Sequence, residues 1–351
     1  MTKLLKIEIA VLLILVIVAV GIRLGDVHAP GDITVNDPTE LQPTVQVTEP
    51  TVAPTEPLPT DPPPTTEPPT EPPVEVVLGD SFTMEAKHWF AYHCGEERML
   101  VTSHDPTEKI WPASVTKLFS AHVALKYLDP ETVVKVGTEV NLVAADSSIA
   151  YIKPGHKLTV AQLVEGMMLP SGNDAAYALA VAAARAESGD SKMSAKDALA
   201  RFVELMNQEA QDQGMTGSHW ANPDGYHDFD HYTSIADLVT IAKLALDNEL
   251  ILQCTGTPTD RVVYVSGEVA NWNNTNQLIR PDSQYYCPDA VGLKTGNTSY
   301  AGFSLLSAYK MEGEYVIVGI FKCQRPEERF SNSLRLYEVI KDAYGYNDTE
   351  E

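Results

Sequence analysis

Three short motifs that carry reactive side chains follow one another along this chain of 351 residues. They read Ser114-Val115-Thr116-Lys117, Ser171-Gly172-Asn173 and Lys294-Thr295-Gly296. A serine hydroxyl becomes a nucleophile only when a base removes its proton, and a buried lysine beside other cations can have a pKa low enough to act as that base. The ordered set therefore predicts covalent catalysis at Ser114, with a second polar pair and a cationic strand nearby.

The first motif falls where a helix is expected, over the apolar residues 111–128. Residues three apart share a face of a helix, so Ser114 and Lys117 project together. Ser114 lies in the first turn, where free N–H groups favour negative charge. Ser307-Ala308-Tyr309-Lys310 has the same spacing. It lies in a predicted strand, where positions three apart point to opposite faces, so we expect only the first copy to form a serine–lysine pair.

The other two motifs supply groups that can face the nucleophile. A helix is expected to end just before Ser171, so Ser171 and Asn173 lie in a turn with a hydroxyl and an amide available. Lys294 and Thr295 lie in a predicted strand, and Gly296 permits a close approach of another backbone segment. An unpaired strand edge can bind an extended peptide, and the Lys294 ammonium with the Thr295 hydroxyl could hold a carboxylate.

The elements that must position these motifs form three groups. Residues 86–103 alternate and predict a hairpin. Further helices are predicted over 159–169, 173–184, 194–213, 234–246 and 331–344, and strands over 262–266, 289–295, 301–309 and 314–322. Strands from both chain ends make one sheet, and the central helices form a separate layer or lobe, which is an α+β arrangement.

Composition argues against several other classes of protein. The formal net charge of −23 argues against nucleic acid as a partner, because binding it needs a basic face. The cluster of His227, Asp228, Asp230 and His231 matches no H-E-x-x-H metal motif, and no G-x-S-x-G elbow is present, so neither a metal site nor a Ser-His-Asp triad is expected. The four cysteines could form up to two disulfides or remain free thiols: Cys94, Cys254, Cys287 and Cys323.

The chain divides into four segments. Residues 1–29 have lysines before an apolar run, which predicts an export signal or a membrane anchor, and we favour an uncleaved anchor with the N-terminus in the cytoplasm. Residues 30–78 form a disordered linker rich in Pro, Thr and Glu that could extend over roughly 150 Å. Residues 79–346 make one catalytic domain, and 347–351 an acidic tail.

With these residues in place, the chain resembles the D-alanyl-D-alanine carboxypeptidases among the low-molecular-weight penicillin-binding proteins over about residues 80–345. The flanks of the three motifs match as well as their cores. Further matching segments are Asn222-Pro223-Asp224-Gly225, His231-Tyr232-Thr233-Ser234 and Asn274-Thr275-Asn276. The resemblance implies a β-lactamase/DD-peptidase-like fold, with an antiparallel sheet flanked by helices and a mostly helical lobe.

The resemblance also implies a reaction that needs neither metal nor organic cofactor. Lys117 would deprotonate Ser114, which attacks the carbonyl between the two terminal D-alanines of a peptidoglycan stem peptide. Ser171 would help to pass the proton to the departing D-alanine, and Asn173 would hydrogen-bond the substrate amide. Water would then release the acyl-enzyme. A β-lactam antibiotic, which mimics this substrate, would acylate Ser114.

Substrate binding is implied at the third motif. Lys294 and Thr295 would hold the terminal carboxylate, next to Gly296, and the backbone N–H groups of Ser114 and Asn297 would form the oxyanion hole. Asn297 stands where many relatives have histidine, which bears on fine substrate preference. The anchor and linker would hold the domain on the cell-wall side of the cell membrane, or the domain would be secreted if residues 1–29 are cleaved.

Two alternatives to a carboxypeptidase stay open. A DD-endopeptidase that cuts cross-links would use the same site on another substrate. A non-catalytic wall-binding or β-lactam-sensing protein would use the anchor and linker, but would not need a nucleophile with its base. A class A β-lactamase is not expected, because no glutamate stands four residues before an asparagine between Asn173 and Lys294.

Overall fold

The computed structural model describes residues 73–80 and 82–346 of the chain. The expected anchor at 1–29, the linker up to residue 72 and the acidic tail at 347–351 lie outside the described residues, and the segment boundaries stay predictions. Within the described ranges, no helix is both long and apolar enough to cross a membrane.

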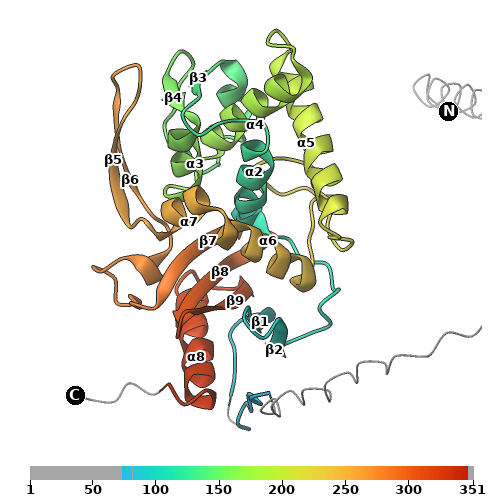
Figure 1. Cartoon of the computed structure of the whole chain (residues 1–351), viewed down its shortest axis with the longest axis vertical. Coiled ribbons are helices and arrows are strands. Elements are labelled where there is room, and N and C mark those ends of the chain that lie inside the picture. The colour runs from blue at the N-terminus through green and yellow to red at the C-terminus, as the bar shows by residue number, and fades with distance from the viewer. Residues whose placement is uncertain (1–72, 81, 347–351) are drawn as a thin grey trace, which may run out of the picture. The chain divides into compact units, whose positions relative to one another are not determined.

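The central element is a five-stranded antiparallel sheet in the order β2-β1-β9-β8-β7 (Figure 1). Its strands are β1 His88–His93, β2 Arg98–Thr102, β7 Ala290–Thr298, β8 Gly302–Met311 and β9 Glu314–Cys323. The first hairpin pairs with the last strand, so both parts of the domain's sequence contribute to one sheet. The predicted α+β class is confirmed, and β7, which carries the third motif, is an edge strand.

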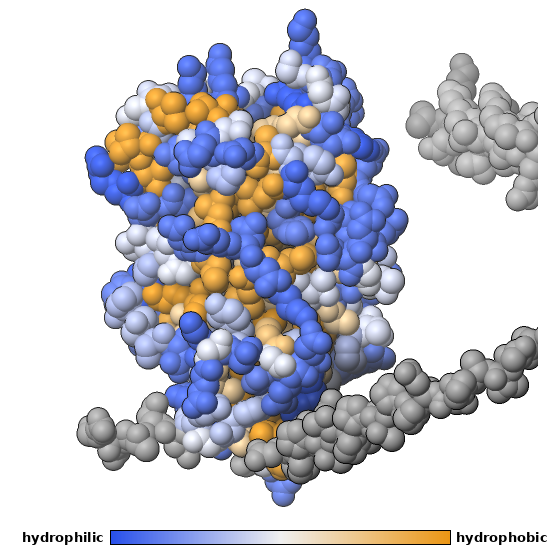
Figure 2. Space-filling view, viewed as in Figure 1, coloured by the Kyte–Doolittle hydropathy of each residue, from blue (hydrophilic) through white to orange (hydrophobic). Residues whose placement is uncertain are grey.

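The helices lie mainly between the two groups of strands in the sequence. In chain order they are the 3-10 helix η1 Ala113–Val115, α2 Thr116–Leu125, the 3-10 helix η2 Thr138–Leu142, α3 Val160–Met168, α4 Asn173–Ser188, α5 Ala195–Asp212, α6 Ile235–Asp247, α7 Glu249–Gly256, the 3-10 helix η3 Gln277–Ile279 and α8 Glu328–Ala343. Two small hairpins complete the domain: β3 Val133–Lys135 with β4 Lys157–Thr159, and β5 Thr259–Val263 with β6 Val269–Asn273. The β5–β6 hairpin carries an apolar surface, on which Val263, Val265 and Val269 are about half-exposed (Figure 2).

The sheet separates two hydrophobic cores because alternate strand residues point to opposite faces. On one face, Leu305 and Tyr309 of β8 pack against α8, where the rings of Tyr309 and Tyr337 stack with centroids 4.0 Å apart. On the other face, Leu306 of β8 and Ile317 of β9 join the larger core that the central helices fill. These helices therefore fix the position of everything that lies between the sheet and the helical lobe.

Local sequence signals account for several helix starts. Thr159 caps α3 in a capping box with Gln162, as the sequence predicts. Ser194 and Ser234 cap α5 and α6 through their hydroxyls. The strand predicted over 262–266 is wrong in position, since β5 occupies 259–263, and β3, β4, β6 and α7 were not predicted. Three-residue strands such as β3 and β4 carry too few residues to show a hydrophobic period.

Two other sequence questions are answered by the fold. Ser307 lies on β8 with its hydroxyl buried and donating to the carbonyl oxygen of Val318 at 3.1 Å, whereas Lys310 is exposed. The second S-x-x-K copy therefore forms no pair, as predicted. All four cysteines are free thiols, and Cys94 is the one that is not fully buried.

The contact between β1 and β9 gives a test of this packing. Gly319 lies opposite Phe90, and a Cβ at position 319 would lie 2.0 Å from Cε1 of this fully buried ring. We expect Gly319→Ala to lower the free energy of unfolding by about 1–3 kcal/mol, as overpacking does, when measured by urea denaturation. Gly79→Ala is the matched control, because nothing lies within 4 Å of its Cβ position. Equal stability of the two variants would contradict this packing, and Phe90→Leu in the Gly319→Ala background should restore part of the loss.

Candidate active site

Ser114 and Lys117, the predicted nucleophile and base, lie at the start of the first central helix. Ser114 occupies the 3-10 turn η1, which leads directly into α2, and Lys117 is in the first turn of α2. The Lys117 Nζ atom donates to Ser114 Oγ at 2.8 Å and to the carbonyl oxygen of Asp224 at 2.7 Å. Ser114 faces the cleft, whereas Lys117 has no exposed surface. The predicted pair is therefore present with a geometry that allows direct proton transfer.

Burial sets the acidity of this lysine. Removal from water disfavours the ammonium form and lowers the pKa of Lys117 to about 8, although the carboxyl groups of Asp224 and Asp174 act in the opposite direction. Lys294 is fully buried as well, and burial together with the charges of Lys117 and Arg329 lowers its pKa well below the usual value. The repulsion among these cations therefore acts on the pKa of Lys294, whereas burial is what lowers the pKa of Lys117 and favours its neutral form beside Ser114.

The segment 222–225 supports the nucleophile from one side. Gly225 has a φ of +81°, and a Cβ there would lie 1.8 Å from the carbonyl oxygen of Ala113. The segment is fixed by the Ser120 hydroxyl, which donates to the carbonyl oxygen of Pro223 at 2.7 Å, and by Asn222, which accepts from the Gly225 N–H at 2.8 Å. Only glycine allows this approach, and the approach brings the Asp224 carbonyl to Lys117.

One histidine of the cluster at 227–231 has a structural role. His231 is fully buried; its Nδ1 accepts from the Ala221 N–H at 3.2 Å, so its Nε2 carries the proton and donates to Thr116 Oγ1 at 2.8 Å. Burial lowers the pKa of His231 to about 3, so the ring stays neutral. His231 therefore links the segment 221–231 to α2, the helix that carries Lys117.

The second motif lies at the N-terminus of α4. Ser171 has a φ of +62° and lines the cleft, and Asn173 is the first residue of α4. The Asn173 side-chain amide donates to Ser147 Oγ at 2.9 Å, while its Oδ1 is buried without a hydrogen-bond partner in the described chain. An unsatisfied acceptor beside the cleft is costly and therefore fits a ligand N–H.

Asp174 was missed by the sequence reasoning, and it fixes the loop that faces this motif. Its buried carboxylate accepts from the N–H groups of Ala150 at 2.7 Å and Ile152 at 2.8 Å. The loop it holds contributes Asp146 and Ser147 to the cleft. An acidic residue in the first turn of a helix is typical of an ordinary helix-dipole partner, so no separate sequence signal indicates this contact.

The third motif runs along the free edge of β7. A Cβ at Gly296 would lie 2.8 Å from the carbonyl oxygen of Pro112 and 3.5 Å from the Ser114 N atom, so the strand passes directly beside the nucleophile turn. Thr295 and Asn297 line the cleft, and Thr295 Oγ1 is 2.6 Å from Thr275 Oγ1. Lys294 does not line the cleft. Its Nζ donates to the Thr295 carbonyl oxygen at 3.2 Å, one layer behind the cleft wall.

Arg329, from α8, is a further cation that the sequence reasoning missed. Its Nη1 donates to the Gly296 carbonyl oxygen at 3.2 Å, its Nε is buried without a partner in the described chain, and the side chain lines the cleft. Burial lowers the pKa of Arg329 to about 10, so it stays charged at neutral pH. The cleft wall therefore includes an incompletely paired cation that is held at the Gly296 carbonyl oxygen.

These residues surround one cleft of about 430 Å³. Tyr226 donates to Asp146 Oδ1 at 2.8 Å and so joins two of the loops that line it. At one part of the wall the rings of His227 and Tyr300 stack with centroids 3.7 Å apart, and Trp111 packs against both edge-on. The cleft thus combines a nucleophile with its base, an amide acceptor, an edge strand and a cation.

The chain is similar to a known family of enzymes. The family model described as D-alanyl-D-alanine carboxypeptidase matches residues 75–324. A relative of that name from Streptomyces sp. strain K15 is 32% identical over 247 residues, which cover 67% of this chain and 80% of the relative. D-alanyl-D-alanine carboxypeptidase DacF of Bacillus subtilis is 28% identical over 240 residues, which cover 68% of this chain and only 57% of the relative.

Solved structures agree with this match. The crystal structure of the Streptomyces K15 DD-transpeptidase superposes with a TM-score of 0.65 at 28% identity, covering 75% of this chain and 98% of that one. The predicted DD-peptidase-like fold is therefore confirmed. The family model covers more than half of the chain and includes all three motifs, so this chain belongs to the D-alanyl-D-alanine carboxypeptidase family of serine peptidases.

Proposed function

We propose that this chain is a serine D-Ala-D-Ala carboxypeptidase that removes the terminal D-alanine from peptidoglycan stem peptides. The observation that carries the proposal is the fully buried Lys117, whose Nζ lies 2.8 Å from Ser114 Oγ. A neutral amine in this position takes the hydroxyl proton as Ser114 attacks the peptide carbonyl. The C–N bond then breaks to give an acyl-enzyme and D-alanine, and water hydrolyses the ester.

The groups around the dyad have separate parts in this reaction. We assign proton delivery to the leaving amine to Ser171, and the substrate N–H to the unpartnered Oδ1 of Asn173. The N–H groups of Ser114 and Asn297 would stabilise the oxyanion, since β7 passes beside the nucleophile turn. Such donors typically contribute about 3–4 kcal/mol to transition-state stabilisation.

We add Arg329 to the residues predicted to bind the terminal carboxylate of the substrate. Thr295 and Arg329 both face the cleft, so we assign direct contacts with the terminal carboxylate to them. Lys294 lies behind the wall and contributes to the positive potential of the site when it is protonated. An edge strand such as β7 binds an extended peptide through its own backbone groups, which places the peptide carbonyl at Ser114.

The same site is expected to react with β-lactam antibiotics, which would acylate Ser114. The substrate belongs to the cell wall, which supports the proposal that residues 1–29 hold the domain at the cell membrane with residues 79–346 on the wall side. A second candidate activity is transfer of the acyl group to an amine instead of water. It is favoured by the similarity to a protein named a DD-transpeptidase.

The direct test measures D-alanine release from a diacetylated Lys-D-Ala-D-Ala peptide by the full chain. We expect release by the wild type, a loss of at least about 10³-fold in Ser114→Ala, and inhibition by penicillin. Formation of an amide when an amine acceptor is added would indicate transpeptidation. No release, but cleavage of a cross-linked muropeptide, would replace the proposal with an endopeptidase. Penicillin labelling of Ser114 without turnover of either peptide would replace the proposal with a non-catalytic β-lactam-sensing protein.

The proton transfer has its own test in the pH dependence. Because only neutral Lys117 accepts a proton, and its pKa is about 8, about a tenth of the enzyme is competent at pH 7. We expect kcat/KM to rise roughly tenfold per pH unit and to level off above about pH 8. A bound carboxylate adds negative charge and raises this pKa, so the kcat profile should lie at higher pH. A kcat/KM that does not change with pH across this range would contradict the assignment of Lys117 as base, and Lys117→Arg should be inactive.

Arg329 is tested by comparing two substrates. Loss of a charge-assisted hydrogen bond costs about 1.5–3 kcal/mol, so Arg329→Gln should lower kcat/KM about 10–100-fold for the peptide carboxylate, mainly through KM. The same peptide with a C-terminal amide should be affected much less. Arg325→Gln is the matched control, because the Arg325 side chain is 65% exposed and outside the cleft. Equal losses on both substrates would show that Arg329 supports the fold of β7 and not the carboxylate.

A further inference from the structure

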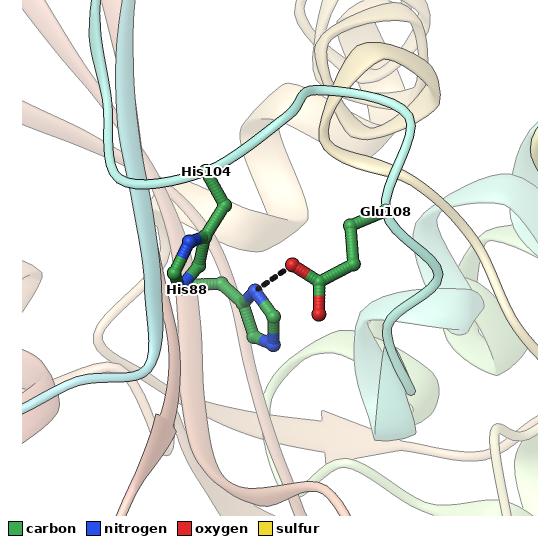
Figure 3. Close-up of side chains that lie close together, drawn as sticks. All are labelled: His88, His104 and Glu108. Carbon is green, nitrogen blue, oxygen red and sulfur yellow. Dashed lines mark ion pairs between the residues drawn. The ribbon is translucent and has the colours of Figure 1, made fainter.

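A group of three potential metal ligands lies outside the cleft. His88 comes from β1, and His104 and Glu108 come from the segment that follows β2 (Figure 3). One ligand atom from each residue lies within 4.8 Å of the others. The rings of His88 and His104 meet edge-on with centroids 5.3 Å apart, and the Glu108 carboxylate faces His88.

His88 is the fixed member of this group and has an unused ring nitrogen. The residue is 3% exposed, and its buried Nδ1 has no hydrogen-bond partner in the part of the chain that the structure describes. Glu108 Oε2 lies 3.7 Å from this Nδ1, which is too far for a hydrogen bond. A buried nitrogen left unpaired costs free energy, so the position fits a ligand that the protein itself does not supply.

The other two ligands have room to close around an ion. His104 is exposed, and the Glu108 side chain is 38% exposed, so both can rotate. Lys87 Nζ holds Glu108 Oε1 at 3.1 Å, which leaves Oε2 available on the side of His88. Donor atoms around tetrahedral zinc lie about 3.3 Å apart, given metal–ligand distances of about 2.0–2.2 Å, so small rotations are sufficient.

The ligand set indicates which cation fits. Two imidazoles and one carboxylate offer too few oxygen ligands for Mg²⁺ or Ca²⁺, whereas the positive charges of Lys87 and Lys322 act on any cation at this position. Zinc gains much of its affinity from imidazole nitrogens and commonly takes two histidines and one carboxylate, with water in a fourth position.

We propose that His88, His104 and Glu108 bind a zinc ion. The ion would join β1 to the segment 104–108, which leads through Trp111 to the nucleophile turn at Ser114. Its effect would be to stabilise the approach to the active site, at a position separate from the cleft residues. This inference does not depend on the proposed peptidase activity.

The test is zinc binding to the full chain, measured by competition with a chromophoric chelator, with the cysteines kept reduced by a phosphine. We expect one zinc ion per chain, and at least ~10-fold weaker binding in His104→Ala and in Glu108→Gln, since even outer partners of a metal site typically change its affinity 10–100-fold. Both residues are at least partly exposed, so these variants are expected to fold. Zinc should also raise the thermal midpoint of the wild type and not that of His104→Ala.

His219→Ala is the matched control, because His219 is also exposed and lies outside the cluster. Binding that is unchanged in this control and weakened in the two cluster variants supports the site. The proposal is overturned if the wild type does not bind zinc, or if His104→Ala and Glu108→Gln bind it as tightly as His219→Ala does. Cys94→Ser identifies a thiol as the true ligand if it alone removes binding.

Discussion

The burial of the Lys117 ammonium without a paired carboxylate is the constraint on which the rest of the site depends. Its Nζ makes hydrogen bonds to one hydroxyl and one carbonyl oxygen, neither of which carries a full charge. A charge buried in this way is costly, and the cost is reduced when the proton leaves. The same cost that destabilises the protonated form lowers the pKa of Lys117 to about 8, which suits the proposed role of this lysine as the base.

The fold maintains this condition through close contacts between backbone segments. Gly225 and Gly296 bring two segments, distant in sequence from each other, against the turn of Ala113 and Ser114, where no Cβ would fit. Behind the predicted nucleophile, Lys117 has no exposed surface and donates to the Asp224 carbonyl oxygen. The sheet and the helical lobe are held together at this point, so the active site and the packing of the domain are not separable. Substitutions at either glycine would disturb both.

Much of this could be predicted from the sequence, because the signals are local. The spacing of Ser114 and Lys117 requires only a helix to bring them together, and the capping box at Thr159 is complete within four residues. The apolar runs along β8 and β9, with a short turn between them, were sufficient to predict this hairpin of the sheet. The strand carrying Lys294 was predicted as a free edge, and it is one.

The residues that were missed act over long sequence distances. Arg329 contacts a carbonyl oxygen 33 residues earlier in the chain, and nothing in its local sequence distinguishes it from the exposed Arg325. Asp174 holds a loop more than 20 residues before it, through backbone N–H groups that any sequence offers. The position of Lys294 behind the cleft wall likewise depends on how β7 packs against its neighbours. Such contacts follow from tertiary structure and have no periodic or local pattern.

The proposed activation of Ser114 depends on one proton, and the most direct measurement is the titration of Lys117 itself. Lysine side chains labelled with ¹³C can be followed by NMR as a function of pH, with Lys117→Arg used to assign the signal. The account predicts a midpoint of about 8 for Lys117, well below the value of about 10.4 for an exposed lysine. A midpoint near the exposed value would mean that Lys117 stays protonated while the enzyme works, and that another group must activate Ser114.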